Sequence, residues 1–178
     1  VRTAEAIGET RVIAFDMGGT STDVSLYDGA FERVFDTEVA GVQMRVPMMA
    51  VETVAAGGGS MLRFDGARFR VGPESAGANP GPAAYRRGGP LTVTDANILC
   101  GKIVPRLFPA IFGPAGDQAL DAASVERDFA ALAQQVGNPE PRDVAEGFLR
   151  IAVANMAAAI KRVALERGRD AAEFTLQC

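Results

Sequence analysis

Apolar and polar residues follow one another in patterns that predict strands in the first half of the chain and helices in the second. Residues 12–15 form an apolar run with the length and β-branched content of a buried strand, and residues 24–27 alternate apolar and polar side chains like a second strand. The segment between them contains two glycines and three hydroxyl residues. It is therefore predicted to be a hairpin loop.

The pattern predicts further strands downstream. Residues 31–38 read as a third strand, and residues 42–46 alternate cleanly until Pro47, which should end that strand. We expect these strands to continue the first hairpin as a meander. Residues 61–71 predict another hairpin around Asp65-Gly66-Ala67, and residues 72–90 are so rich in glycine and proline that they form either a functional loop or a disordered one.

The second half carries helical periodicity. Thr94 is predicted to be the N-cap of a short helix with Asp95 in its first turn, and residues 124–136 predict an amphipathic helix. Apolar side chains then recur with helical spacing from residue 142 to residue 167, which predicts a long scaffold helix. Residues 174–176 begin a last strand close to the end of the chain.

Length and charge narrow the class of protein. The 178 residues, 48% of them hydrophobic, fit one domain spanning residues 1–178, and the interrupted last strand together with the missing start methionine suggests a fragment of a larger chain. The net charge is −4 and the basic residues are scattered, which argues against nucleic acid as a partner. The sequence has no membrane-length apolar stretch and no signal-peptide pattern, so we expect no membrane partner and a cytoplasmic location.

The absence of one residue type limits the possible chemistry. The chain has no histidine, so by itself it cannot form His-based zinc sites, Ser-His or Cys-His pairs, or histidine acid–base catalysis. Cys100 and Cys178 have no motif spacing, and burial is the simpler role for Cys100. Any reaction must use carboxylates, hydroxyls, backbone dipoles and a bound metal.

The predicted hairpin loop has the composition of a phosphate cradle. Glycine N–H groups can approach an oxyanion closely because no Cβ intervenes, and hydroxyl groups add further donors. Asp16 and Asp23, at the two rims, can hold Mg²⁺ that bridges to phosphate oxygens, which makes them the candidate catalytic and metal-binding residues. The candidate phosphate-binding residues are Gly18, Gly19, Thr20, Ser21 and Thr22.

The alternative is an ordinary glycine turn with surface aspartates. The pattern is neither a P-loop nor a dinucleotide fingerprint, since both of these open a helix and a strand follows here. The second glycine cluster, Gly57, Gly58 and Gly59, is either a further oxyanion contact or a bend where two backbones pass closely. Asp95 and Asn97 either line a cleft or cap a helix, and Arg86 and Arg87 either bind a substrate carboxylate or form a solvated rim.

Several sequence blocks together resemble a known family. They are residues 15–24, TVAAGGGS at 53–60, VGPESAGANPGP at 71–82, GGPLTVTDAN at 88–97, FPAIFGP at 108–114 and ERGRD at 166–170. On these blocks the chain resembles the hydantoinase A/oxoprolinase family over residues 12–176, and within it the ATP-dependent 5-oxoprolinases. The resemblance also favours a role for Gly57, Gly58 and Gly59 in binding.

The resemblance implies a fold and an activity. It implies an α/β fold, namely a ribonuclease H-like lobe of the actin, sugar kinase and heat-shock chaperone ATPase superfamily, with a mixed sheet and packed helices. The chain would be the second lobe, truncated at its C-terminal end, with the first lobe missing. The implied reaction opens 5-oxoproline to glutamate and cleaves ATP to ADP and phosphate, as in glutathione metabolism, with Mg²⁺ as cofactor and a partner subunit of the hydantoinase B type.

Three departures and two rival functions remain open. Many relatives have His or Asn where this chain has Glu52, Cys where it has Ala84, and His where it has Arg169, so a family role of those positions is not carried over to this chain. Alanine in particular cannot replace a reactive thiol. The rivals are a kinase-like phosphotransferase and a nucleotide-contacting module that is inactive when isolated.

Overall fold

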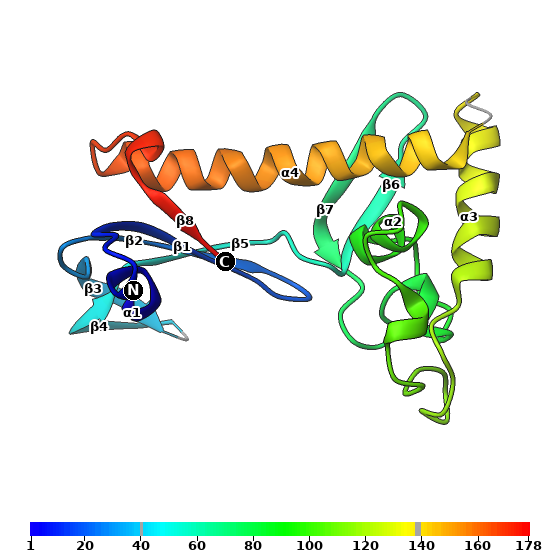
Figure 1. The fold of residues 1–178 in the computed structure, drawn as a ribbon, viewed down its shortest axis with the longest axis horizontal. Helices are drawn as coiled ribbons and strands as arrows, with labels where there is room; N and C mark the ends of the chain where they lie inside the picture. Colours follow the sequence, from blue (N-terminus) through cyan, green and yellow to red (C-terminus); the bar gives the residue numbers. More distant parts are fainter. Residues whose placement is uncertain (40, 138–139) are drawn as a thin grey trace. The chain divides into compact units, whose positions relative to one another are not determined.

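The computed structural model describes residues 1–39, 41–137 and 140–178, and its contacts group into two compact units (Figure 1). Unit 1 comprises Val1–Met17, Thr22–Val54 and Ala157–Cys178, and unit 2 comprises Gly18–Ser21 and Ala55–Met156. Each unit is described separately below. The single domain expected from chain length stays a prediction. No helix of the described residues is long and apolar enough to cross a membrane.

Unit 1 is built on a mixed four-stranded sheet. Its strands are β1 (Arg11–Met17), β2 (Thr22–Asp28), β5 (Val51–Val54) and β8 (Thr175–Gln177), in the order β5-β2-β1-β8. β2 pairs antiparallel with both β1 and β5, whereas β8 runs parallel to β1. The predicted first hairpin and the predicted last strand are confirmed.

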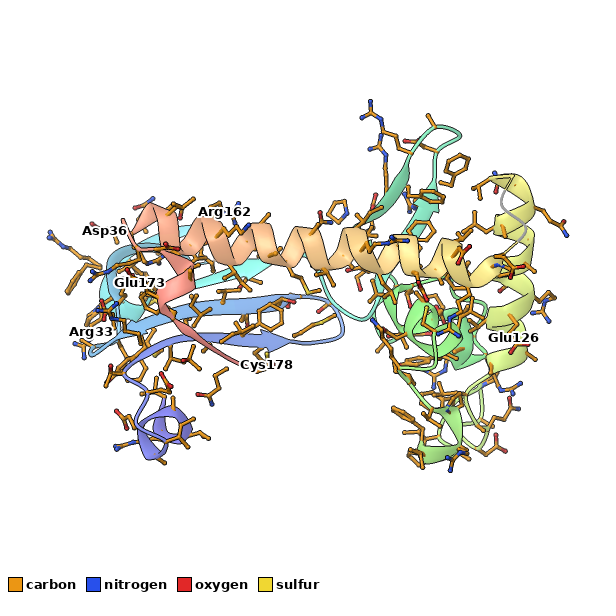
Figure 2. The ribbon with its side chains drawn as sticks, turned by 45° about the horizontal axis from the view of Figure 1, so that its top comes forward. Arg33, Asp36, Glu126, Arg162, Glu173 and Cys178 are labelled. Atoms are coloured by element: carbon orange, nitrogen blue, oxygen red, sulfur yellow. The ribbon has the colours of Figure 1, made fainter. Side chains whose placement is uncertain are left out.

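One face of this sheet packs on the C-terminal part of helix α4 (Pro141–Glu166). Ile13 of β1 and Val24 of β2 are buried against Val163 on the helix, because alternate residues of a strand point to the same face. Arg162, on the same part of α4 (Figure 2), lies 3.9 Å from the carboxylate of Glu52 on β5. The short helices α1 (Arg2–Ala6) and η3 (Ala171–Glu173) complete the unit.

Two strand predictions are corrected by the structure. β3 (Arg33–Val39) and β4 (Val42–Met49) form a separate two-stranded sheet, while β5 takes the place beside β2 that the meander assigned to residues 31–38. Pro47 does not end the strand. It lies where the β3–β4 register shifts, and a bulge tolerates the missing N–H of proline.

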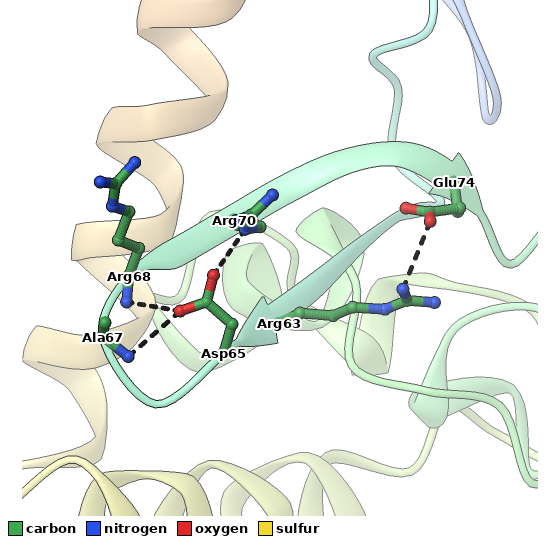
Figure 3. Close-up of polar contacts among 6 residues, drawn as sticks. All are labelled: Arg63, Asp65, Ala67, Arg68, Arg70 and Glu74. Carbon is green, nitrogen blue, oxygen red and sulfur yellow. Dashed lines mark hydrogen bonds and ion pairs between the residues drawn. The ribbon is translucent and has the colours of Figure 1, made fainter.

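Unit 2 contains the second predicted hairpin, which is confirmed. β6 (Ser60–Phe64) and β7 (Phe69–Ser75) are joined by a turn in which Asp65 accepts the N–H groups of Ala67 and Arg68 at 3.1 and 2.9 Å (Figure 3). Asp65 also binds Arg70 at 2.7 Å. These donors, the Arg68 N–H foremost, lower the pKa of the Asp65 carboxyl below 3.8.

Helices enclose the core of unit 2. α2 (Val93–Leu99), α3 (Ala122–Gln135) and the N-terminal part of α4 surround Phe129 and Phe148, both of which are fully buried. The connections include η1 (Ala83–Tyr85) and η2 (Pro105–Leu107). The two longer helices confirm the periodicity predictions. The predicted N-cap is corrected, because α2 begins earlier and Thr92 caps it in a capping box with Asp95.

Candidate functional site

The hairpin between β1 and β2 ends in the predicted glycine loop. The strand register runs without a break to Met17 paired with Thr22, which leaves Gly18–Ser21 as the tip. Within the tip, the Gly18 N–H donates to the carbonyl of Ser21 at 2.8 Å. Gly18, Gly19 and Thr20 are exposed, so the tip is open to a ligand.

The second glycine cluster holds the tip by its carbonyl groups. The Gly58 N–H donates to the carbonyl of Gly18 at 3.1 Å, and the Gly59 N–H donates to the carbonyl of Gly19 at 2.6 Å. Both contacts lie within unit 2. They fix the orientation of two successive peptide planes of the tip.

This orientation leaves two N–H groups aimed away from the glycine cluster. In a trans peptide the N–H points opposite to the C=O. The N–H groups of Gly19 and Thr20 therefore point away from the glycine cluster, which binds the carbonyl groups of the same two peptide bonds. Among the described residues, neither N–H donates a hydrogen bond. Successive free N–H groups held in this way form a concave anion-binding arrangement.

Glycine at position 57 is required by the closeness of the two backbones. A Cβ there would lie 2.8 Å from the Gly18 carbonyl oxygen and 2.9 Å from both the Gly19 carbonyl carbon and the Thr20 nitrogen. The glycine cluster is thus a bend where two backbones pass closely, one of the two alternatives left open by the sequence. Direct ligand contact by Gly57, Gly58 and Gly59 stays a prediction.

The glycine cluster is itself anchored on both sides. The carbonyl of Gly58 accepts the N–H of Thr94 at 2.8 Å and its Oγ1 hydroxyl at 2.9 Å. The Gly57 N–H donates to Ser60 Oγ at 2.9 Å, and the Gly59 carbonyl accepts the Ala76 N–H at 2.9 Å. The tip is therefore supported by a rigid stack that ends on the first turn of α2.

In unit 1, two carboxylates face each other across the same hairpin. Asp16 and Asp23 are direct register partners and both are exposed. Directly opposed side chains share a face, with Cβ atoms about 4.5–5.5 Å apart, and like charges in that relation are destabilising. Thr53 of β5 donates its hydroxyl to the Asp23 carboxylate at 2.7 Å, which orients that side chain.

The donor set suits a hydrated divalent cation. Mg²⁺ is usually bound through one or two carboxylates plus waters and phosphate oxygens, not by a complete protein cage. Asp16 and Asp23 supply two carboxylates, and the described residues contain no cluster of three or more potential ligands of the His, Cys, Asp or Glu type. The arrangement fits Mg²⁺ held with a phosphate group.

Comparison with known proteins decides the family. The family model described as hydantoinase/oxoprolinase matches residues 1–178, which is the whole chain. The chain belongs to the hydantoinase/oxoprolinase family. The sequence resemblance on which the family was first suggested is therefore confirmed.

Individual relatives agree with this family. The chain is 45% identical to 5-oxoprolinase 1 of Arabidopsis thaliana and 46% identical to 5-oxoprolinase of Saccharomyces cerevisiae, over 96% and 93% of its own length. It spans only 14% and 13% of those two proteins. The crystal structure of the ATP-dependent caprolactamase from Pseudomonas jessenii superposes with a TM-score of 0.80 at 36% identity, covering 97% of this chain and 25% of that one. This likeness supports the α/β fold with a mixed sheet.

The three departures from the hydantoinase/oxoprolinase pattern occupy different environments. Glu52 lies near Arg162, and Arg169 binds the carboxylate of Asp28 at 2.8 Å. Both positions therefore take part in ion pairs of unit 1. Ala84 is completely buried in the core of unit 2, where any larger side chain would face packed atoms instead of solvent.

Other candidate residues have structural partners. Asp95 is buried and accepts a hydrogen bond from the N–H of Thr92, which is the capping alternative. It also accepts the N–H groups of Ala83 and Ala84 in η1. Arg86 and Arg87 are both exposed, as in the solvated-rim alternative, and Arg86 also binds Asp121 at 2.9 Å. Arg87 donates to the carbonyl groups at positions 113 and 78. Thr22 is buried, so Thr20 and Ser21 carry the more accessible hydroxyls of the tip.

Two residues hold neighbouring segments in place by hydrogen bonds that the sequence did not predict. Thr94 was expected to cap a helix, but it instead holds Gly58. Asp95 was expected to line a cleft or cap its helix, yet it also fastens the η1 segment. The signal was present in the run Thr92-Val93-Thr94-Asp95, because the spacing from Thr92 to Asp95 is that of a capping box.

Proposed function

We propose that this chain is the part of an ATP-dependent cyclic amide hydrolase that holds the nucleotide phosphates through the Gly18–Ser21 tip. The observation that carries the proposal is that, among the described residues, the N–H groups of Gly19 and Thr20 have no acceptor. The carbonyl groups of the same two peptide bonds are held by hydrogen bonds from the second glycine cluster. Such preorganised donors stabilise phosphate charge without reorganising during the reaction. A plain glycine turn needs no such clamp.

The proposed substrate is 5-oxoproline, which is opened to glutamate while ATP is cleaved to ADP and phosphate. The names of the relatives, 5-oxoprolinase and ATP-dependent caprolactamase, support lactam opening coupled to ATP. An unstrained lactam is a poor acyl donor, and bound ATP supplies the phosphoryl group that activates its amide oxygen before water attacks. Because the chain spans about a seventh of the 5-oxoprolinase relatives, the rest of such a protein would hold the lactam.

The residues of this chain position and stabilise charge. The N–H groups of Gly19 and Thr20, with the Thr20 hydroxyl, would bind phosphate oxygens. Asp16 and Asp23 would hold Mg²⁺ or its waters, and Thr53 keeps the Asp23 carboxylate oriented. In phosphoryl transfer the protein contributes mainly such positioning and electrostatic stabilisation.

We also propose a superfamily for the fold and further parts of the active assembly. A sheet of three antiparallel strands with β8 added in parallel supports a ribonuclease H-like lobe of the actin, sugar kinase and chaperone ATPase type. We infer that a first lobe and a hydantoinase B-type subunit complete the active protein. The relative named caprolactamase subunit alpha, 38% identical over 97% of this chain, supports a multisubunit assembly.

The deciding experiment is an ADP-release assay on the full-length protein, with and without its partner subunit. ADP release that depends on 5-oxoproline and yields glutamate is expected, and Asp16→Asn should lower kcat by about 100-fold because it removes stabilisation of developing charge. Asp36→Asn, an exposed carboxylate on β3, is the matched control and should leave kcat unchanged. A stable phosphate ester as product would instead establish the kinase-like alternative.

A further inference from the structure

The β3–β4 hairpin of unit 1 has one mainly polar and one mainly apolar face. Asp36 and Arg45 are register partners joined by an ion pair of 3.7 Å, and Gln43 shares their face by alternation. The residues between them therefore point to the other side. The apolar ones are Phe35, Val42, Met44, Val46 and Met49, and Arg33, the register partner of Met49, lies on the same side.

The apolar face is uncovered. Its five apolar residues are between 38% and 60% exposed, with Val46 the least and Val42 the most exposed. An isolated two-stranded hairpin is marginally stable in water, and antiparallel sheets normally bury one face while the other is solvated. Here the face that normally packs inward is the one open to solvent. Apolar residues that are exposed together on one surface mark an interaction site.

We propose that this apolar face is a docking surface for polypeptide of the same parent protein that lies outside residues 1–178. The Arabidopsis and yeast relatives match nearly all of this chain, yet the matched region is only 14% and 13% of their length. Most of such a polypeptide is therefore available to cover the hairpin. A segment on the same chain acts at millimolar effective concentration, which favours it over a second copy.

The composition of the face fits a folded partner segment. Met44 and Met49 are flexible, polarizable side chains that adapt to irregular apolar surfaces. The one charged residue of the face with a described position is the exposed Arg33, the register partner of Met49 at the end of the hairpin. The partner would therefore present mainly apolar side chains, and the charged pair Asp36–Arg45 would remain in water on the far side. This inference rests on family membership and hairpin geometry, and it does not depend on the proposed nucleotide function.

Methionine oxidation of the full-length protein tests the proposal with an internal control. Met44 and Met48 are both 41% exposed, but Met48 pairs with Val34 beyond the register shift and shares the polar face. Because packed interfaces exclude solvent, Met44 should react with hydrogen peroxide at least about fivefold more slowly than Met48. The ratio should return to about one after unfolding in urea, where both side chains are solvated. Equal rates in the native protein would overturn the proposal.

Two further measurements separate the possible occupants. Protection of Met44 that disappears on dilution to a monomer would assign the surface to a second copy, and protection only with the hydantoinase B-type subunit would assign it to that subunit. Either result overturns the proposal. Val42→Lys should lower the thermal midpoint of the full-length protein by several degrees, whereas Gln43→Lys on the polar face should not change it. Equal midpoints for these two variants would also contradict docking.

Discussion

Thr94 binds the carbonyl oxygen of Gly58 twice, through its backbone N–H at 2.8 Å and its Oγ1 hydroxyl at 2.9 Å. Gly58 in turn donates its N–H to the tip of the β1–β2 hairpin. The exposed tip is thus connected to the first turn of α2 by a continuous series of hydrogen bonds. Its shape depends on residues that are distant in the sequence.

Thr94→Val should weaken this support without changing the size of the side chain. Loss of one hydrogen bond to a partly buried carbonyl should lower the unfolding free energy by about 1 kcal/mol, measured by urea denaturation. Thr94→Ser keeps the hydroxyl and serves as the control, which should stay near the parent value. Equal losses in both variants would show that the methyl group, and not the hydroxyl, matters.

Gly57→Ala should displace the tip, because the new Cβ would lie within 2.9 Å of backbone atoms that have no flexible end to move. We expect an unfolding free energy lower by about 1–3 kcal/mol, and a weaker affinity of the full-length protein for ATP in titration calorimetry. Gly147→Ala on α4 is the control, since its Cβ would meet no atom within 4 Å. That control should stabilise the helix by up to about 1 kcal/mol.

Asp16→Asn should stabilise the fold while it lowers kcat. Removing one of two directly opposed carboxylates relieves repulsion worth roughly 0.2–1 kcal/mol in the absence of divalent cations. Thermal unfolding with and without Mg²⁺ and ATP checks this, since the ligands should raise the midpoint of the parent protein and leave that of the variant nearly unchanged. A parent-like ligand shift in the variant would remove Asp16 from the metal site.

Asp95→Asn tests the hydrogen bonds by which the Asp95 carboxylate holds the η1 segment. The carboxylate accepts four hydrogen bonds, and an amide would turn an NH₂ group toward a backbone N–H such as that of Ala84. A buried donor left without an acceptor should cost about 1–3 kcal/mol of unfolding free energy. Hydrogen exchange should locate the loss at η1.

The pH dependence of this variant has a definite sign. Burial raises the pKa of Asp95 above 3.8 in the folded state, against its hydrogen-bond donors. The folded state therefore keeps the proton to higher pH than the unfolded chain, and the contribution of Asp95 falls as pH rises from 3.8 through the folded pKa. The difference in unfolding free energy between parent and Asp95→Asn should narrow over that range.

Asp65→Asn is the control, because the unfolding free energy that Asp65 contributes should depend on pH in the opposite direction. The pKa of Asp65 is lowered in the folded state, first by the Arg68 N–H, so its contribution is present above 3.8 and is lost as pH falls through the lower folded pKa. The difference between parent and this variant should widen as pH rises. Urea titrations of both variants at matched pH values make the comparison, and slopes of the same sign would contradict the assignments.

Local patterns predicted most of the elements. The β1–β2 hairpin, α3, α4 and the β6–β7 hairpin follow from periodicity and turn residues, because these signals act between neighbours in the chain. The motif with Gly18 and Gly19 likewise identified the candidate tip, and several sequence blocks together indicated the family. The start of α2 was misplaced because Thr92 and Thr94 are both good N-cap residues, and only packing selects between them.

The sequence by itself determined most of the strands and helices, the family and the residues proposed for the candidate site, since each of these depends on residue type and short-range order. Only the tertiary structure decided that β5, and not β3, pairs with β2, that Thr94 supports Gly58, and that the β3–β4 hairpin exposes its apolar face. These relations join segments that are far apart along the chain. They arise from which surfaces are buried together, a choice that local pattern does not encode.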